Sequence, residues 1–246
     1  MSDPRIEVIE ERLGDVDNII AVASGKGGVG KSMVACTLAM NLRDIGYRVG
    51  LLDLDFTSPS THIILGVKDL FPEEEKGIIP PLAYDMRYMS ITYYAVDEPT
   101  PLRGEDVSNA IIELMAITRW EELDYLVIDM PPGIGDATLD MVRFIDALNF
   151  LLVTIPSRVA FGSVKKLYHL LKDMNVGIMG ILENMVIRPT DYIKKEADEL
   201  NLEYLGSIDY DTELEESIGV VEELKNTQFY EQVRDISKQI VDRRLD

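Results

Sequence analysis

The chain has 246 residues, of which 46% are hydrophobic and 28% charged, as is usual for a globular protein with a sizeable core. Its 44 acidic residues outnumber its 24 basic residues, which gives a formal net charge of −20 at pH 7. General binding to nucleic acids or to anionic membranes needs a basic surface. We therefore expect no nucleic-acid partner and no stable membrane association.

The sequence shows neither a membrane-spanning pattern nor a signal-peptide pattern. No apolar run approaches the roughly 20 residues of a membrane span. Residues 1–5 lack the pattern of a signal peptide. The single cysteine, Cys36, excludes an internal disulfide and fits a reducing compartment. We expect one cytoplasmic domain that spans residues 1–246.

The first predicted elements surround a glycine-rich segment. Residues 4–13 predict a short helix, residues 18–23 an apolar strand, and residues 31–45 a second helix. Between that strand and the second helix lies the sequence Gly25-Lys26-Gly27-Gly28-Val29-Gly30-Lys31-Ser32. It matches the G-x-x-x-x-G-K-[ST] pattern of a phosphate-binding loop, with strand and helix where the motif needs them. This setting favours phosphate binding over an ordinary glycine-rich turn.

The chemistry of this loop is that of a nucleotide site. Glycines let successive backbone N–H groups and the helix N-terminus approach an anion. Lys31 is expected to reach the β- and γ-phosphates, and the Ser32 hydroxyl to ligate Mg²⁺. The residues expected to contact the nucleotide here are Gly25, Lys26, Gly27, Gly28, Val29, Gly30, Lys31, Ser32 and Met33.

Two acids follow the next predicted strand, residues 47–52. Ligands of open α/β sheets bind outside the carboxyl ends of strands, so Asp53 and Asp55 should face the nucleotide. Residues at i and i+2 of an extended segment share a face. One acid could then orient the attacking water while the other helps to hold Mg²⁺. The alternative is capping of a short following helix, for which Ser58 or Ser60 is an equal candidate.

The middle of the chain is less informative. Residues 66–85, rich in proline, glycine and glutamate, predict a long mobile loop, and a solvated loop is favoured over a regulatory lid. Residues 86–96 predict one long strand or a strand pair. Residues 106–118 predict a helix.

A second acidic strand end completes the nucleotide chemistry. Residues 123–129 form a buried strand that ends in Asp129, the Walker B pattern, and this acid would accept hydrogen bonds from Mg²⁺-bound water. Next come Pro132, in a stiff proline pair, and Gly133, whose backbone N–H could reach a γ-phosphate. Such a contact would exist only while the γ-phosphate is present, so this loop would change its conformation on hydrolysis and act as a switch. A carboxylate that merely ends a strand in a turn is the alternative for Asp129.

The remaining segments continue the alternation of strands and helices. After the strand at 176–182, the Asn184 amide could pair with a purine base, although a turn-forming asparagine is equally consistent. The last helix carries an apolar stripe that is expected to pack on the sheet rather than to bind a membrane. The other predicted elements are a strand at 150–155, a helix at 159–172, a helix at 190–200, a strand at 203–208 and a helix at 227–241.

The position of Lys26 sets this loop apart from ordinary phosphate-binding loops. With Lys26 included, the loop resembles the deviant Walker A of MinD/ParA-like ATPases, and most of all that of the Mrp/ApbC-type iron–sulfur cluster carriers. The other matching pieces are residues 50–55, Ser58-Pro59-Ser60, Arg103-Gly104, residues 123–133, Gly135-Asp136 and residues 182–185.

The resemblance implies an α/β fold with a doubly wound, mainly parallel sheet and helices on both faces. It also implies a homodimer that sandwiches two ATP molecules, in which Lys26 reaches across to the nucleotide of the partner. Lys31, Ser32, Asp55 and Asp129 would serve their own site. Binding and hydrolysis of ATP with Mg²⁺ would then switch the dimer between two arrangements.

The departure from the family concerns the cargo. These carriers usually place C-x-x-C shortly after the residues that match 182–185, so that two chains offer four thiolates. Here residues 186–192 contain no cysteine, and Cys36 lies inside a predicted helix. A cluster would need imported thiols or unusual ligands.

Two function classes remain open. The first is an iron–sulfur assembly factor that passes clusters to apoproteins with the help of a scaffold or a cysteine-bearing paralogue. The second is a regulatory or positioning ATPase that recruits a protein partner without a cluster. A metabolic kinase is less favoured, because no acceptor-substrate site is evident.

Overall fold

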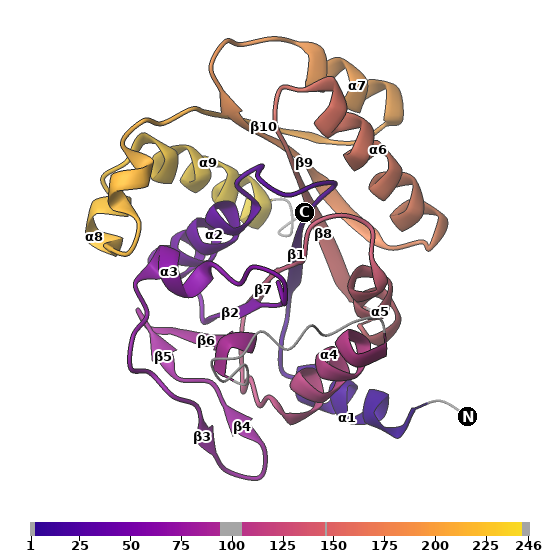
Figure 1. Cartoon of the computed structure of the whole chain (residues 1–246), viewed down its shortest axis with the longest axis vertical. Coiled ribbons are helices and arrows are strands. Elements are labelled where there is room, and N and C mark those ends of the chain that lie inside the picture. The colour runs from indigo at the N-terminus through magenta and orange to yellow at the C-terminus, as the bar shows by residue number, and fades with distance from the viewer. Residues whose placement is uncertain (1–2, 94–104, 146, 243–246) are drawn as a thin grey trace.

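The computed structural model describes residues 3–93, 105–145 and 147–242 (Figure 1). Its centre is an eight-stranded sheet in the order β10-β9-β8-β1-β7-β2-β6-β5. All neighbours in this sheet pair in parallel except β5 and β6. The predicted pair Arg103-Gly104 and the end of the 86–96 strand lie outside the described residues.

The strands of this sheet are apolar and, at its centre, buried on both faces. Every residue of β1, β2 and β7 is buried, as expected for a parallel sheet covered on both sides. The strands are β1 (Ile19–Ser24), β2 (Val49–Asp53), β5 (Leu82–Ala83), β6 (Met86–Ser90), β7 (Tyr125–Asp129), β8 (Leu148–Thr154), β9 (Gly177–Val186) and β10 (Tyr204–Asp209).

Helices cover both faces of the sheet, which confirms the doubly wound α/β prediction. One core packs α1 (Pro4–Leu13), α4 (Glu105–Ile117), α5 (Asp136–Phe144), α6 (Arg158–Asp173) and α7 (Tyr192–Leu200) on one face. A second core packs α2 (Lys31–Ile45), α3 (Thr61–Leu65), α8 (Val221–Leu224) and α9 (Gln228–Asp242) on the other. Short 3₁₀ turns lie at Ile91–Tyr93 and Leu214–Ser217.

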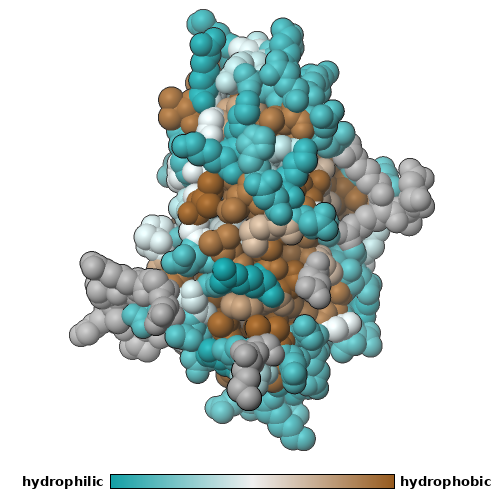
Figure 2. Space-filling model, turned by 90° about the vertical axis from the view of Figure 1, so that its right-hand side faces the viewer, coloured by the Kyte–Doolittle hydropathy of each residue, from teal (hydrophilic) through white to brown (hydrophobic). Residues whose placement is uncertain are grey.

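The surface that carries α5 and α6 is not uniformly polar. Hydrophobic residues gather in the middle of this side of the molecule, and hydrophilic residues cover its upper end (Figure 2). Within the parts of the chain that the structure describes, no helix combines the length and the apolar character needed to cross a membrane.

The prediction of one long loop over residues 66–85 is wrong. This stretch contains an antiparallel pair, β3 (Glu73–Glu74) and β4 (Ile78–Ile79), and then β5, which joins the edge of the main sheet. The backbone N–H of Arg119 donates to the carbonyl of Ile78 at 2.8 Å, so a distant segment fixes the hairpin in place. Two-residue strands are too short to leave a periodic pattern in the sequence. The prolines and glycines of this stretch, which indicate a loop, are therefore its strongest local signal.

Helix α3 begins where the chain returns to the end of β2. Asp53 is fully buried, and its Oδ2 accepts hydrogen bonds from the backbone N–H groups of Ser60 and Thr61, both at 3.1 Å. The Thr61 hydroxyl donates to the same oxygen at 2.7 Å, while Oδ1 accepts from the backbone N–H of Asp55 at 3.0 Å. Both oxygens of Asp53 therefore accept hydrogen bonds, and its carboxylate holds the first N–H groups of α3. Asp53 does not line the cavity described below, so its expected role beside Mg²⁺ stays a prediction. Ser60 is the N-cap residue of α3, but its side chain makes no capping hydrogen bond.

We expect Asp53→Asn to lower the free energy of unfolding by about 1–3 kcal/mol, because either orientation of the amide sets an NH₂ group against backbone donors. Asp55→Asn is the matched control. Oδ1 of Asp55 accepts backbone hydrogen bonds from Thr57 and Ser58, and an asparagine oxygen can keep them. Denaturant unfolding of both variants measures the difference. Equal stability of the two would contradict the role of Asp53 at the start of α3.

Candidate functional site

The predicted phosphate-binding loop connects β1 to α2 and is held by close packing on two sides. A Cβ atom at Gly25 would lie 2.4 Å from the backbone of Ser163 and Val164 in α6. A Cβ atom at Gly30, which has φ of +80°, would lie 2.2 Å from the Asn184 side chain. Gly27 and Gly28, in contrast, face open space within 4 Å. The outer glycines therefore fix the loop, and the inner ones leave its backbone accessible to an anion.

A cavity of about 500 Å³ lies against this loop, at the carboxyl ends of β1, β2 and β7. It brings together predicted site residues from three segments: Gly27, Gly28, Gly30, Lys31, Ser32, Met33, Asp55 and Pro132. Thr57, Ser58, Ser60, Ile63, Ile64 and Ile218 also line it. No local pattern indicates Ile218, which reaches the cavity from a segment far along the chain.

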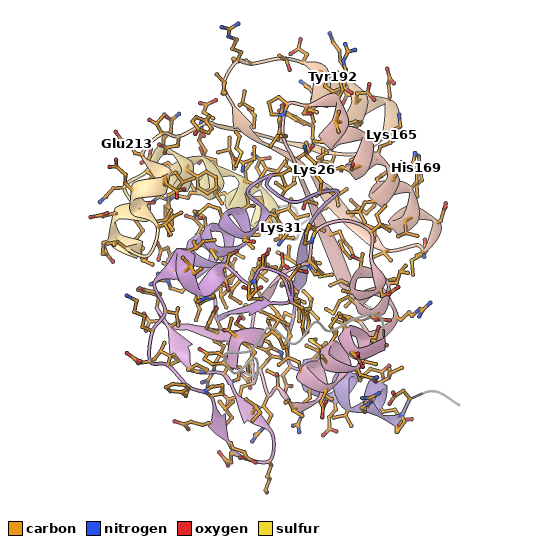
Figure 3. All side chains as sticks on the ribbon, in the orientation of Figure 1. Lys26, Lys31, Lys165, His169, Tyr192 and Glu213 are labelled. Atoms are coloured by element: carbon orange, nitrogen blue, oxygen red, sulfur yellow. The ribbon has the colours of Figure 1, made fainter. Side chains whose placement is uncertain are left out.

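Several predicted residues lie outside the cavity wall. Gly25, Val29, Asp53, Asp129, Gly133 and Asn184 support it from behind or beside, and Lys26 does not line it either. Figure 3 places Lys26 closer than Lys31 to α6, in agreement with the packing of Gly25 on that helix.

A buried ion pair lies beneath the loop. Lys31, whose side chain is 6% exposed, pairs through Nζ with Oδ1 of Asp129, which is fully buried at the end of β7. Lys31 Nζ also lies 3.3 Å from the Ser32 hydroxyl. Burial raises the pKa of Asp129 to about 6, against the lowering effect of the Lys31 charge. The positive charge of Lys31 thus compensates the negative charge of Asp129.

The second oxygen of Asp129 has different surroundings. Oδ2 is buried and has no hydrogen-bond partner in the described parts of the chain. A buried carboxylate oxygen without a hydrogen bond costs free energy of folding, and a bound water molecule would remove this cost. Oδ2 is therefore suited to accept a hydrogen bond from a water bound to magnesium. Together with the Ser32 hydroxyl, this donor set suits a hard cation such as Mg²⁺.

Asp55 is the acid that faces the cavity. Its Oδ1 accepts hydrogen bonds from the backbone N–H groups of Thr57 and Ser58, both at 3.1 Å, and this turn fixes the side chain. The carboxylate lines the cavity with only 6% of the residue exposed. Of the two acids after β2, Asp55 is therefore the one that lines the cavity.

Gly133 and Asn184, which were predicted to contact the nucleotide, instead form hydrogen bonds with the protein backbone. The Gly133 N–H donates to the Ser24 carbonyl at 2.8 Å, so in this conformation it is not open to a γ-phosphate. The Asn184 amide is 2% exposed and donates from Nδ2 to the Val29 carbonyl at 2.9 Å. Asn184 thus braces the phosphate-binding loop here instead of facing a base. Both partners come from distant segments, which the sequence pattern could not identify.

The cysteine lies inside a helix, as predicted. Cys36 is fully buried within α2, and burial raises the pKa of its thiol well above the usual range. Among the residues that the structure describes, no group of three or more histidine, cysteine or acidic side chains could hold a metal ion.

Comparison with known sequences identifies the family. Residues 15–243 match the ParA family model, described as NUBPL iron-transfer P-loop NTPase. The chain is 37% identical over 254 residues to an iron-sulfur cluster carrier protein of Methanocaldococcus jannaschii, covering 96% of this chain and 88% of that protein. It is also 37% identical over 222 residues to the carrier protein of Aquifex aeolicus, covering 84% of this chain but 61% of that longer protein.

Solved structures agree with this assignment. A nucleotide-binding protein in complex with ADP from Archaeoglobus fulgidus has a TM-score of 0.75 at 29% identity, covering 89% of this chain and 92% of that one. The cell division ATPase MinD of Pyrococcus furiosus shares the fold, with a TM-score of 0.68 at 23% identity over 92% of this chain and 99% of that one. The chain therefore belongs to the ParA family of iron-transfer P-loop NTPases.

Proposed function

We propose that this chain is a cytoplasmic, Mg²⁺-dependent ATPase that works as a dimeric switch. The observation that carries the proposal is the cavity against the phosphate-binding loop, with Lys31 and Asp129 paired beneath it and one Asp129 oxygen left without a partner. A triphosphate would enter between the loop backbone and Asp55. The ADP complex of the Archaeoglobus fulgidus protein supports nucleotide binding in this fold.

Each residue would then have a distinct part in the reaction. Lys31 would move its ammonium group from Asp129 to the β- and γ-phosphates, which exchanges one anionic partner for another. Ser32 and Asp129 would hold Mg²⁺, the latter through water, and bound Mg²⁺ supplies charge neutralisation at the phosphates. Asp55 would position the attacking water with the oxygen that its turn leaves unused.

The dimeric part of the proposal concerns Lys26. Its side chain is partly exposed, does not line the cavity of its own chain, and forms no ion pair with the described residues. Large apolar side chains are exposed after the carboxyl ends of several strands, on Ile63, Ile134, Val159 and Ile187. A second copy that covers these side chains would bring Lys26 to the partner's nucleotide, where it acts as an added positive charge.

The cargo is the iron–sulfur cluster, bound with thiols that a partner supplies. The names of the relatives support cluster handling, whereas the described residues offer no cysteine besides the buried Cys36. A scaffold, a cysteine-bearing paralogue or the receiving apoprotein would therefore complete the ligand set. The same lack of exposed thiols favours, as a second candidate, a regulatory switch that recruits a protein partner without a cluster.

Lys31→Ala should weaken binding of ATP by about 10- to 150-fold, because loss of a charge-assisted hydrogen bond typically costs about 1.5–3 kcal/mol. Titration with a fluorescent ATP analogue at fixed Mg²⁺ and salt measures the affinity. Lys238→Ala, which removes an exposed charge on α9, is the matched control. Unchanged affinity in the Lys31 variant would contradict the assignment of the loop.

Lys26→Ala should leave nucleotide binding to the monomer intact while it reduces turnover and ATP-dependent dimerisation. The reason is that this lysine is expected to serve the partner's site rather than its own. Sedimentation velocity with and without ATP measures the dimer. If the variant dimerises as the unmodified protein does, Lys26 has no bridging role.

Anaerobic reconstitution with iron, sulfide and a small thiol separates the two candidate functions. A stable chromophore with stoichiometric iron supports the carrier, because imported thiols then suffice to hold a cluster. A colourless protein, beside a cysteine-bearing relative that reconstitutes in parallel, supports the regulatory switch instead.

A further inference from the structure

A second cavity, of about 390 Å³, lies at the end of α2 remote from the phosphate-binding loop. Arg43, Arg48 and Arg87 line it together with Leu82, Trp120 and Leu123. The 15 residues of α2 correspond to a length of about 22 Å, so this cavity is separate from the nucleotide site. Three acids, Asp85, Glu121 and Glu122, line it as well, so the question is which arginine these acids leave without a close partner.

Two of the three arginines pair closely with acids of the protein. Arg48 donates from Nη1 to Glu122 at 2.6 Å and from Nη2 to Asp124 at 2.8 Å. Arg87 donates to the Pro80 carbonyl at 3.0 Å and pairs with Glu121. Asp85, Glu121 and Glu122 also line the cavity, and the charges of Arg48 and Arg87 are offset by their acidic partners.

Arg43 has unused capacity. Its Nε is buried and has no acceptor in the described chain. Its Nη1 lies 3.8 Å from Asp85, beyond hydrogen-bond distance, and that carboxylate is 88% exposed. Such an exposed pair contributes little to stability. Nη2 lies 3.1 Å from Asp44, which also accepts a hydrogen bond from the Tyr230 hydroxyl at 2.7 Å, and Nη2 donates to the Met40 sulfur at 3.6 Å.

The apolar part of the cavity wall lies beside Arg43. Leu82 is 56% exposed, and Leu123 and Trp120 form a buried wall. A guanidinium with spare donors beside apolar side chains is the usual composition of a site for an organic acid.

We infer that this cavity binds a small organic anion, with an apolar body and a carboxylate or phosphate head group. The head group accepts hydrogen bonds from Arg43 and takes the place of Asp85. The apolar body covers Leu82 and rests on the wall that Trp120 and Leu123 form. The exchange costs little, because the Arg43–Asp85 contact is long and solvated.

The chain's only tryptophan, Trp120, makes the test specific to this cavity. Phenyl phosphate and benzoate are titrated into the protein at about 0.15 M salt, with calorimetry to measure binding and Trp120 emission to locate it. Benzyl alcohol, which has a similar apolar body without a charge, is the neutral control. We expect saturable heat and a saturable change in Trp120 emission with at least one of the two anions, and neither signal with benzyl alcohol. The anion that binds more tightly identifies the preferred head group.

Three variants sharpen the result. Arg43→Gln should weaken binding at least tenfold, whereas Arg188→Gln, which removes an exposed arginine elsewhere, should not. Lys31→Ala should retain the Trp120 response, which shows that the signal does not arise at the phosphate-binding loop. Absence of saturable heat with both anions, equal binding of benzyl alcohol, or unchanged binding by a folded Arg43→Gln variant would overturn the inference.

Discussion

The buried ion pair between Lys31 and Asp129 is the interaction on which the site depends. Removal of one partner of such a pair usually costs about 3–5 kcal/mol, because the other charge stays buried without compensation. The Lys31 ammonium group can therefore move away from Asp129 at low cost only if it pairs with another anion. Asp129 then needs a cation to replace Lys31. A triphosphate with Mg²⁺ meets both needs at once. Under the proposed function, this exchange is the reason that Lys31 and Asp129, which lie almost a hundred residues apart in sequence, are held in contact.

The fold brings these groups together through the order of its strands. β7 pairs with β1, and Val22 lies opposite Asp129 in their register, so the Walker B acid ends beside the start of the loop. α2, which begins with Lys31, is in turn held by α9, since the Asn41 amide donates to the Tyr230 carbonyl at 3.3 Å. The position of Lys31 thus depends on the carboxyl-terminal helix as well as on the sheet.

Patterns that are local in sequence were predictable, and contacts between distant segments were not. The phosphate-binding loop, the strand that ends in Asp129 and the alternation of strands and helices all leave local signals. The i, i+2 spacing of Asp53 and Asp55 could not show that the N–H groups of Ser60 and Thr61 return to Asp53. In the same way, the pairing of Asn184 with the Val29 carbonyl depends on how β9 approaches the loop. The role of each polar residue was therefore harder to predict than its presence at the site.

Isothermal titration calorimetry with ATP on folded, nucleotide-stripped protein tests the central claim most directly. The account predicts a saturable isotherm near one nucleotide per chain, with weaker binding when EDTA removes Mg²⁺, because Asp129 then lacks a cation to replace Lys31. Absence of any binding heat with either ATP or ADP at several temperatures would contradict it.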